Sequence, residues 1–341
     1  MRFETWLRVA LASTLLLGAL AYGFILLLDP YQDVPFSPPL ARAPISTNQR
    51  YSYPAIARSP AYDSAVVGTS TMRLLDPARL DAGSGARFAN LAMNSATAYE
   101  QGRILELFLR HHPAPRVVVL GNDGTWCNRR DDVADYTFRA FPEWMFDDHR
   151  WNDLLYLFND KALEDAVRMV EYLAGAREAK YRPDGYRDFT LDFGRYEPRA
   201  VKRRLYKARP KPAEQGDALP RLAHPGWRYP LLDELAAHVT RIPAATRVVL
   251  IYPPVHDHYL QTMAVNVGEC KARTAALLAS RADLVTLDYM RPTALTRDDG
   301  NFWDAVHTTA AVARRIEDDV VAVLGGAWPR SPEVAVIPPA R

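Results

Sequence analysis

The chain contains little cysteine and almost no excess charge of either sign. Two cysteines in 341 residues can form one intramolecular disulfide at most. A formal net charge of +2 predicts neither a nucleic-acid partner nor an acidic one, so an electrostatic preference has to come from local clusters. No internal repeat is present, and 48% hydrophobic residues against 24% charged ones argue against disorder. These features predict one large globular domain or two small ones.

Only one long hydrophobic run occurs, and it lies at the N-terminus. Residues 9–28, VALASTLLLGALAYGFILLL, form twenty uncharged positions, enough to cross a hydrocarbon core as a helix. Two arginines precede the run and two aspartates follow it, so we expect residues 1–30 to be a cytoplasmic tip and transmembrane anchor, with the rest outside the cytoplasm. The ALA at 19–21 resembles a signal-peptidase site, but apolar residues continue after it, which favours an uncleaved anchor.

The export of the main domain bears on the two cysteines. Cys127 and Cys270 then lie in a compartment where disulfides persist. They can pair with each other or remain two separate buried thiols, and the sequence leaves both alternatives open.

The remainder of the chain predicts an α/β domain. Residues 31–60, rich in proline and polar residues, predict an extended linker, residues 61–326 the domain, and residues 327–341 a flexible tail. Apolar runs predict strands at residues 64–68, 87–92, 116–121, 247–253 and 284–288. Periodic patterns predict helices at residues 98–112, 153–175, 231–242, 269–281 and 308–324.

This alternation indicates a three-layer fold in which helices cover both faces of a parallel sheet. Residues 128–242 interrupt it with aromatic, proline and basic residues, and we expect an insertion or lid over the edge of the sheet. Sheets of this class bind ligands at the carboxyl ends of their strands, and Ser70 in VVGTSTMRLLDP follows the first strand at that end.

Ser70 has a candidate base and a candidate acid far along the chain. A nucleophilic serine needs a base, and the base needs an orienting acid. His307 in NFWDAVHTT follows Asp304 by three residues and precedes a periodic helix, a spacing that lets the carboxylate hold the imidazole. The alternative is that Ser70 merely caps the next helix and that His307 is an ordinary satisfied or exposed histidine.

The ordered set of motifs resembles the SGNH (GDSL-type) hydrolase superfamily. The motifs are Gly-x-Ser after strand one, an Asn-containing turn after strand two, Gly-Asn-Asp after strand three, and Asp-x-x-His near the C-terminus. The resemblance implies a flavodoxin-like sheet and a catalytic triad of Ser70, His307 and Asp304.

A narrower resemblance is to membrane-anchored SGNH-like proteins related to those that O-acetylate alginate and other exported polysaccharides. It rests on the anchor, GTS in place of Gly-Asp-Ser, NLAMNSATAYEQ, FPEWMFDD and NFWDAVH, and covers roughly residues 60–325. It implies a single-pass protein of a bacterial inner membrane with a periplasmic domain that uses no cofactor. Its partners would be the membrane, a polysaccharide acceptor and an acyl donor supplied by a membrane-bound acyltransferase.

The resemblance also implies an oxyanion hole. Its donors would be the Ser70 backbone N–H, at a helix N-terminus, and a backbone amide at Asn94 and Ser95. The third motif departs from the family pattern, because GNDG places Asn122 directly after Gly121 and puts Asp123 where the family has an amide donor. An ionised carboxylate only accepts hydrogen bonds, so either Asn122 reaches the site through a shifted turn or Asp123 has another role, such as positioning the acceptor.

Several other residues are candidates for the rim of the site. Thr69 stands beside the nucleophile where the wider family usually has an aspartate. His256 and His258 in PPVHDHYL lack an evident third ligand, so we expect a loop near the rim, together with Asp123 and Trp303, and no metal site.

Basic and aromatic side chains allow a second kind of contact. Residues 195–211, RYEPRAVKRRLYKARPK, predict either a solvated surface helix or a groove for a polyanionic glycan or anionic lipid heads. Four tryptophans either stack on sugar rings or fill the core of their segment: Trp126, Trp144, Trp151 and Trp303.

The expected function is transfer of an acyl group, most simply acetyl, through Ser70 to a hydroxyl of an exported polysaccharide. One alternative is a periplasmic esterase or glycan deacetylase with the same triad. The other is a catalytically silent glycan-binding subunit of a polysaccharide export complex.

Overall fold

A computed structural model describes residues 3–337, which form two compact units. Unit 1 consists of Met1–Ile56 and Ala140–Gly185, and unit 2 of Ala57–Arg139 and Tyr186–Arg341. Residues 338–341 of the expected tail lie outside the described residues. The sheet and the predicted Ser-His-Asp set all belong to unit 2.

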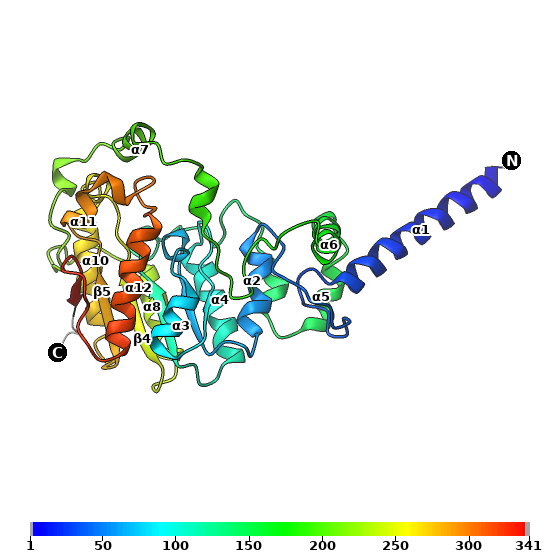
Figure 1. The fold of residues 1–341 in the computed structure, drawn as a ribbon, viewed down its shortest axis with the longest axis horizontal. Coiled ribbons are helices and arrows are strands. Elements are labelled where there is room, and N and C mark those ends of the chain that lie inside the picture. Colours follow the sequence, from blue (N-terminus) through cyan, green and yellow to red (C-terminus); the bar gives the residue numbers. More distant parts are fainter. Residues whose placement is uncertain (1–2, 338–341) are drawn as a thin grey trace. The chain divides into compact units, whose positions relative to one another are not determined.

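Unit 2 is built on one six-stranded sheet of order β2-β1-β3-β4-β5-β6. Figure 1 labels two of its strands, β4 and β5. The strands are β1 Ser64–Val67, β2 Phe88–Asn90, β3 Val117–Gly121, β4 Arg247–Tyr252, β5 Leu284–Asp288 and β6 Ala335–Ile337. The first five pair in parallel, and β6 runs antiparallel to β5. The predicted α/β class with a mainly parallel sheet is therefore confirmed, since β1 and β3 are buried along their whole length, as continuous apolar runs require.

Helices cover both faces of this sheet. Helices α3 (Pro77–Ser84) and α12 (Ala310–Leu324) contribute to one core cluster that includes Val66 of β1 and Val119 of β3. Helices α4 (Ala98–His111) and α8 (Pro230–Arg241) line a small cavity with the next strand residues, Val67 and Leu120, whose side chains point to the opposite face. Helix α10 (Ala264–Leu277) packs on α8.

Shorter elements complete unit 2. The α-helices are α7 Pro198–Leu205, α9 Asp257–Leu260 and α11 Ala294–Arg297. The 3-10 helices are η1 Ser70–Met72, η3 Phe189–Phe193, η4 Pro212–Glu214 and η5 Asp299–Asn301. The expected flexible tail differs from the structure, because β6 extends the sheet and Asp319 of α12 accepts hydrogen bonds from the backbone N–H groups of Arg330 and Ser331.

The direction of winding reverses at β1, since β2 lies on one side of it and β3 to β5 on the other. In open α/β sheets the crevice at such a point is the usual ligand site. Two glycines, Gly68 after β1 and Gly121 at the end of β3, flank the buried Met72 here. A Cβ on Gly68 would lie 2.5 Å from the Met72 Cγ, and one on Gly121 would also overlap it. Small residues at both positions therefore let Met72 fill the space under the Ser70 turn.

Unit 1 combines two segments that are distant in sequence. Its helices are α1 Phe3–Leu28, α2 Gln49–Arg58 (shared with the start of unit 2), η2 Glu143–Phe146, α5 Arg150–Tyr156 and α6 Asp160–Leu173. The helix predicted over 153–175 is interrupted, because Asn159 caps α6 by accepting a hydrogen bond from the Ala162 N–H. Helix α1 is long and apolar enough to cross a membrane, with a mean hydropathy of 2.2 and 11% of its most apolar window buried.

The expected extended linker is instead a packed part of unit 1. Tyr31, Ile45 and Tyr53 are 1%, 2% and 0% exposed. The Asp29 carboxylate accepts hydrogen bonds from the N–H groups of Asp33 and Val34 and thereby turns the chain at the end of α1. The proline and polar residues thus indicate a largely irregular segment. Its tyrosines Tyr31 and Tyr53 are nevertheless buried in the core of unit 1.

Candidate active site

Three side chains from the two ends of unit 2 form a hydrogen-bonded chain. His307 Nε2 lies 2.8 Å from Ser70 Oγ, and His307 Nδ1 lies 2.8 Å from Asp304 Oδ2. Since an ionised Asp304 can only accept, Nδ1 carries the proton and Nε2 is left to accept the Ser70 hydroxyl proton. The structure thus brings together the three residues predicted as a triad, in an arrangement able to move a proton from Ser70 to His307.

The loop that carries Asp304 and His307 is held by its own backbone. Phe302 and Thr308 form an antiparallel bridge, and the Trp303 N–H donates to the His307 carbonyl at 2.8 Å. Asp304 Oδ1 accepts the backbone N–H groups of both Val306 and His307 at 2.9 Å. The loop therefore fixes the position of the Asp304 carboxylate through its own backbone.

The electrostatics of Asp304 favour its ionised form. Burial on its own would raise its pKa, but the hydrogen bond and charge of His307 and the two backbone N–H donors outweigh burial and lower the pKa below the ordinary aspartate value. Asp304 is thus available as an acceptor throughout the neutral range, as orienting His307 requires.

Ser70 opens the 3-10 helix η1, where the sequence predicts the start of an α-helix. The next α-helix, α3, begins only at Pro77, with Asp76 as its N-cap. The N-cap of η1 is Thr69, so the structure gives the capping role, the alternative considered for Ser70, to its neighbour. A single 3-10 turn also supplies little of the helix dipole expected at the Ser70 N–H.

Asp123 braces the turn that presents Ser70. The Thr69 hydroxyl donates to Asp123 Oδ2, and the Thr71 hydroxyl lies 3.5 Å from the same oxygen. Asp123 Oδ1 accepts the Thr125 N–H at 2.9 Å, which ties the loop after β3 to itself. Thr69, directly before Ser70, and Asp123, directly after Asn122, therefore contact each other.

The turn containing Asn94 and Ser95 lies beside the Ser70 turn. The Met93 N–H donates to the Gly68 carbonyl at 3.0 Å, and Arg73 donates to Asn94 Oδ1 at 2.7 Å. Ser95 has a φ of 53°, a left-handed conformation uncommon for a residue with a side chain. These contacts place the expected donor segment next to the nucleophile.

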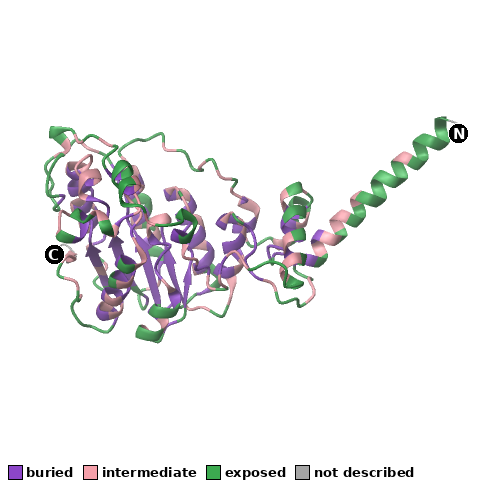
Figure 2. Cartoon of the chain, turned by 45° about the horizontal axis from the view of Figure 1, so that its top comes forward, coloured by how far each residue is buried: buried purple, intermediate pink, exposed green. Residues whose placement is uncertain are grey.

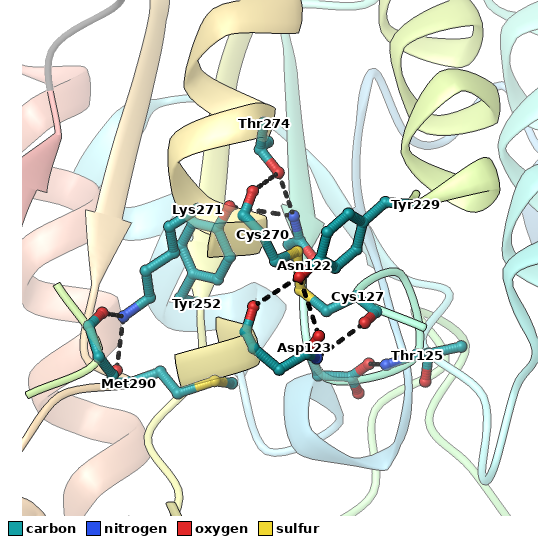
Figure 3. The surroundings of a disulfide bond; sticks show 12 residues. Asn122, Asp123, Thr125, Cys127, Tyr229, Tyr252, Cys270, Lys271, Thr274 and Met290 are labelled. Atoms are coloured by element: carbon teal, nitrogen blue, oxygen red, sulfur yellow. Dashed lines mark hydrogen bonds between the residues drawn. A yellow bond between two sulfur atoms is a disulfide. The ribbon is translucent and has the colours of Figure 1, made fainter. Parts of the chain in front are cut away.

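Asn122 is bonded elsewhere. Its side chain is fully buried, and its amide nitrogen lies 3.2 Å from the Tyr252 hydroxyl and 3.5 Å from Thr274 Oγ1 (Figure 3). Cys127 and Cys270 form a disulfide beside it, the first of the two alternatives for these cysteines. The carboxamide is thus held in the interior by contacts that do not include Ser70 or His307, and it supplies no preformed third oxyanion donor.

The two rim histidines have separate partners. His256 Nδ1 accepts the His258 N–H at 3.3 Å, so its Nε2 donates to Asp299 Oδ1 at 3.0 Å, and burial lowers the His256 pKa. His258 Nε2 lies 2.7 Å from the Ala208 carbonyl. Among residues 3–337, no cluster of three or more His, Cys, Asp or Glu side chains could hold a metal ion.

Two groups of residues at the site were not singled out from the sequence. Asn90 Nδ2 lies within 3.3 Å of the carbonyls of Met72, Arg73 and Leu75 and so supports the chain after Ser70. An asparagine within the apolar run RFANLA was the available signal, since a buried polar side chain needs partners. Phe189 and Phe193 lie 5.5 and 6.2 Å from the His307 ring, and no sequence pattern indicates that contact.

The basic and aromatic segments divide between surface and core. Helix α7 buries Val201 and Leu205 in the core, while its basic residues are exposed, and Arg204 donates to the Trp303 carbonyl at 3.3 Å. The Trp303 ring packs against Phe193 and Tyr196. Of the other three tryptophans considered above, Trp126 is 3% exposed and donates to Gln101, and Trp144 and Trp151 belong to unit 1.

No protein-family model matches this chain, and no curated protein matches it either.

Proposed function

We propose that the protein is a membrane-anchored serine acyltransferase of SGNH type, whose Ser70 carries an acyl group to a hydroxyl of an exported polysaccharide. The observation that carries the proposal is the continuous chain from Ser70 through His307 to Asp304, with 2.8 Å at each step. In this role His307 removes the Ser70 proton as the hydroxyl attacks the donor ester, and Asp304 stabilises the imidazolium that forms. His307 then protonates the leaving group.

The second half of the reaction reverses these roles. His307 takes the proton of a sugar hydroxyl, which attacks the acyl-Ser70 ester, and the proton returns to Ser70 as it leaves. The side chains of His307 and Asp304 are 21% and 31% exposed, so part of the site is open to solvent from which an acceptor hydroxyl can approach. The same exposure admits water, and hydrolysis by the same triad is therefore the competing outcome.

We propose that the protein is anchored in a bacterial inner membrane with its domain in the periplasm. Helix α1 supports this location, because it is long and apolar enough to cross a membrane. An anchor raises the effective concentration of the domain near a membrane-delivered acyl donor, such as one supplied by a membrane-bound acyltransferase. A disulfide between Cys127 and Cys270 suits an oxidising compartment of this kind.

A silent glycan-binding subunit is the second candidate, and one observation favours it. Oxyanion stabilisation needs preorganised donors, yet Asn122 is bonded in the interior and Asp123 is a carboxylate that already accepts from Thr69. The backbone amides at Ser70 and near Ser95 would then have to stabilise the tetrahedral intermediate alone.

The test uses the full chain in lipid nanodiscs, because residues 29–56 pack within the same unit as α1. Wild type and Ser70→Ala are incubated with p-nitrophenyl acetate, with and without an oligosaccharide acceptor, and examined by intact mass. We expect a 42 Da acetyl adduct on wild type only, about one per chain, and acetyl on the sugar when acceptor is present.

Each other result selects an alternative. An adduct that is lost only to water, with no acetylated sugar for any acceptor, indicates an esterase. Identical behaviour of wild type and Ser70→Ala, together with retained glycan binding, indicates the silent subunit and overturns the proposal.

A further inference from the structure

The C-terminal half of α1 is covered by protein on one side. Gly18, Tyr22, Ile25 and Leu28 are half-buried or buried, whereas residues 11–17 are all exposed. Figure 2 shows the corresponding change along the helix, from mainly exposed near the N-terminus to partly buried at the other end. A Cβ on Gly18 would lie 3.8 Å from the Phe158 ring, and the Tyr22 hydroxyl donates to the Leu154 carbonyl of α5 at 2.7 Å. Helix α6 packs on α1 as well. The covered stripe therefore runs from Gly18 to the end of the helix.

This cover leaves too little free helix to cross a bilayer. The uncharged run begins at Val9, so only residues 9–17 precede the first contact, which is about 13 Å of helix against a hydrocarbon core of about 30 Å. Counting from Phe3 adds Glu4 and Arg8 and still gives only about 22 Å. If α1 spans, its covered half lies within the bilayer, and so do the parts of α5 and α6 that touch it.

The outer end of α1 carries the polar groups typical of a membrane boundary. Arg42 donates to the carbonyls of Leu27 and Leu28, at 3.2 and 2.7 Å, and Asp29 follows directly. Around Gly18 the flanking residues Leu17 and Ala19 are apolar, and the polar side chains one turn away, Thr14 and Tyr22, are uncharged. The boundary therefore lies near residue 28, about 15 Å beyond the Gly18 contact.

Three large apolar side chains in and directly after α5 are exposed. In and after α5, Trp151, Leu155 and Phe158 are 68%, 81% and 59% exposed. A groove of 510 Å³ between α1 and α5 is lined by Leu15, Gly18, Leu155 and Phe158, among others. In water, such a surface beside an apolar helix would be an aggregation hazard, whereas acyl chains would fill it.

Helix α6 has the pattern of a helix that lies at a membrane interface. Leu163, Val167 and Val170 are exposed and follow one another at i, i+4 and i+7, so they form one stripe. A separate face carries Glu164 and Arg168, which pair at 2.5 Å. An apolar stripe beside a charged face is the signature of interfacial helices.

We infer that the α5–α6 surface, defined as Trp151, Leu155, Phe158, Leu163, Val167 and Val170, is embedded in the outer leaflet of the bilayer that α1 spans. The occupant of this surface is lipid. The inference rests on the proposed membrane anchoring by α1 and is independent of the chemistry at Ser70. Unit 1 is then a membrane-inserted unit built from two segments of the chain. The sequence alone predicts a single transmembrane helix followed by an extended linker.

The test measures the depth of single labels in the full-length protein. Leu155→Cys, Val167→Cys, Leu16→Cys and the exposed polar control Glu178→Cys are each labelled with the fluorophore NBD. The two native cysteines form a buried disulfide and do not compete for the label. The protein is reconstituted into phosphatidylethanolamine–phosphatidylglycerol vesicles that contain nitroxide lipids at a shallow or a deep acyl position.

We expect blue-shifted emission and at least twofold quenching for labels at residues 16, 155 and 167, and neither for residue 178. Deep nitroxide should quench residues 16 and 155 best, because Leu155 lines the same groove as Leu15 and Gly18, and shallow nitroxide should quench residue 167 best. Lipid-like behaviour at residue 16 with water-like behaviour at 155 and 167 overturns the inference and leaves the anchor intact. Water-like behaviour at residue 16 as well overturns both the inference and the proposed anchoring.

A second measurement separates lipid from a protein occupant. A photo-crosslinking amino acid at position 155 is activated in native membranes, and the adduct is identified by mass. A phospholipid adduct supports the inference. An adduct with another polypeptide overturns it, because the α5–α6 surface would then be a docking site for a membrane protein.

Discussion

The two units reach stability by different routes. Unit 2 has a core of short strands that are buried from end to end, such as β1 and β3, and helices such as α12 contribute apolar side chains to the same core. Unit 1 has no sheet among its described residues, and tyrosines such as Tyr31 and Tyr53, together with buried aspartates, hold two distant segments around one end of α1. The strands of unit 2 can be recognised from the local pattern of apolar residues. Unit 1 forms only when its two distant segments pack against each other.

The largest expected difference between the units concerns chemistry, which the proposal confines to unit 2. Asp304→Asn should reduce the rate of Ser70 acetylation by about 10²–10⁴-fold, because the amide can donate to His307 Nδ1 and stabilise the wrong tautomer. The loss should persist over about pH 5–8, since the lowered pKa of Asp304 keeps the wild-type carboxylate ionised there. Stopped-flow release of p-nitrophenol measures the rate. Tyr31→Phe in unit 1 is the control. A similar loss of acetylation rate in that variant would contradict the proposal that only unit 2 carries the chemistry.

The next largest effect concerns the disulfide, which links the loop after β3 to α10 within unit 2. The double variant Cys127→Ser/Cys270→Ser should destabilise unit 2 by about 2–4 kcal/mol, since the bond closes a loop of 143 residues in the unfolded chain. Hydrogen–deuterium exchange resolves the units separately, with faster exchange expected in β3 and α10 and unchanged exchange in α6. Equal acceleration in α6 would show that the units unfold together.

A smaller effect is expected from the asparagine under the Ser70 turn. Asn90→Ala removes the donor shared by the carbonyls of Met72, Arg73 and Leu75, and we expect a loss of about 1–3 kcal/mol with slower acetylation. Its matched control is Asn159→Ala, which removes the cap of α6 and should cost about 1 kcal/mol in unit 1 without altering the acetylation rate. Unchanged acetylation in Asn90→Ala would show that Asn90 does not position the nucleophile.

The smallest effect concerns a single hydrogen bond in unit 1. Tyr31 Oη donates to Asp165 Oδ2 at 3.2 Å, and Tyr31→Phe should cost about 0.5–1.5 kcal/mol. Asp165 keeps Lys161 and Arg168 as partners, so its charge is not left unpaired. Exchange at the α2 and α6 amides provides the measurement, and a cost above about 3 kcal/mol would mean that the phenol supports more of unit 1 than this bond.

Much of unit 2 could be predicted from the sequence, whereas the packing of unit 1 could not. All five predicted strands occur, and each observed end lies within two residues of the predicted one. A run such as VVVL forms a strand that is buried on both faces, and this can be recognised from the run itself without knowing which strands lie beside it. Ser70, His307 and Asp304 were also identifiable, since each sits in a motif. Residues 31–60 and 140–185 were not recognisable as partners, because contacts between aromatic and proline-rich segments follow no period. The role of Asp123 depends on where Thr69 comes to lie, which spacing alone does not specify.

The interleaving of the two units sets an order of events during synthesis. After Ile56 leaves the ribosome, a further 129 residues (185 − 56) must follow before the last segment of unit 1, ending at Gly185, is complete. At about 5–20 residues per second this takes roughly 6–26 seconds, during which α1 lacks the α5 and α6 segments that cover it. Strands β1 to β3 are made in the interval, but β4 and β5 come later still. The nascent protein thus holds two unfinished units at once, and unit 1 is the first whose chain is complete.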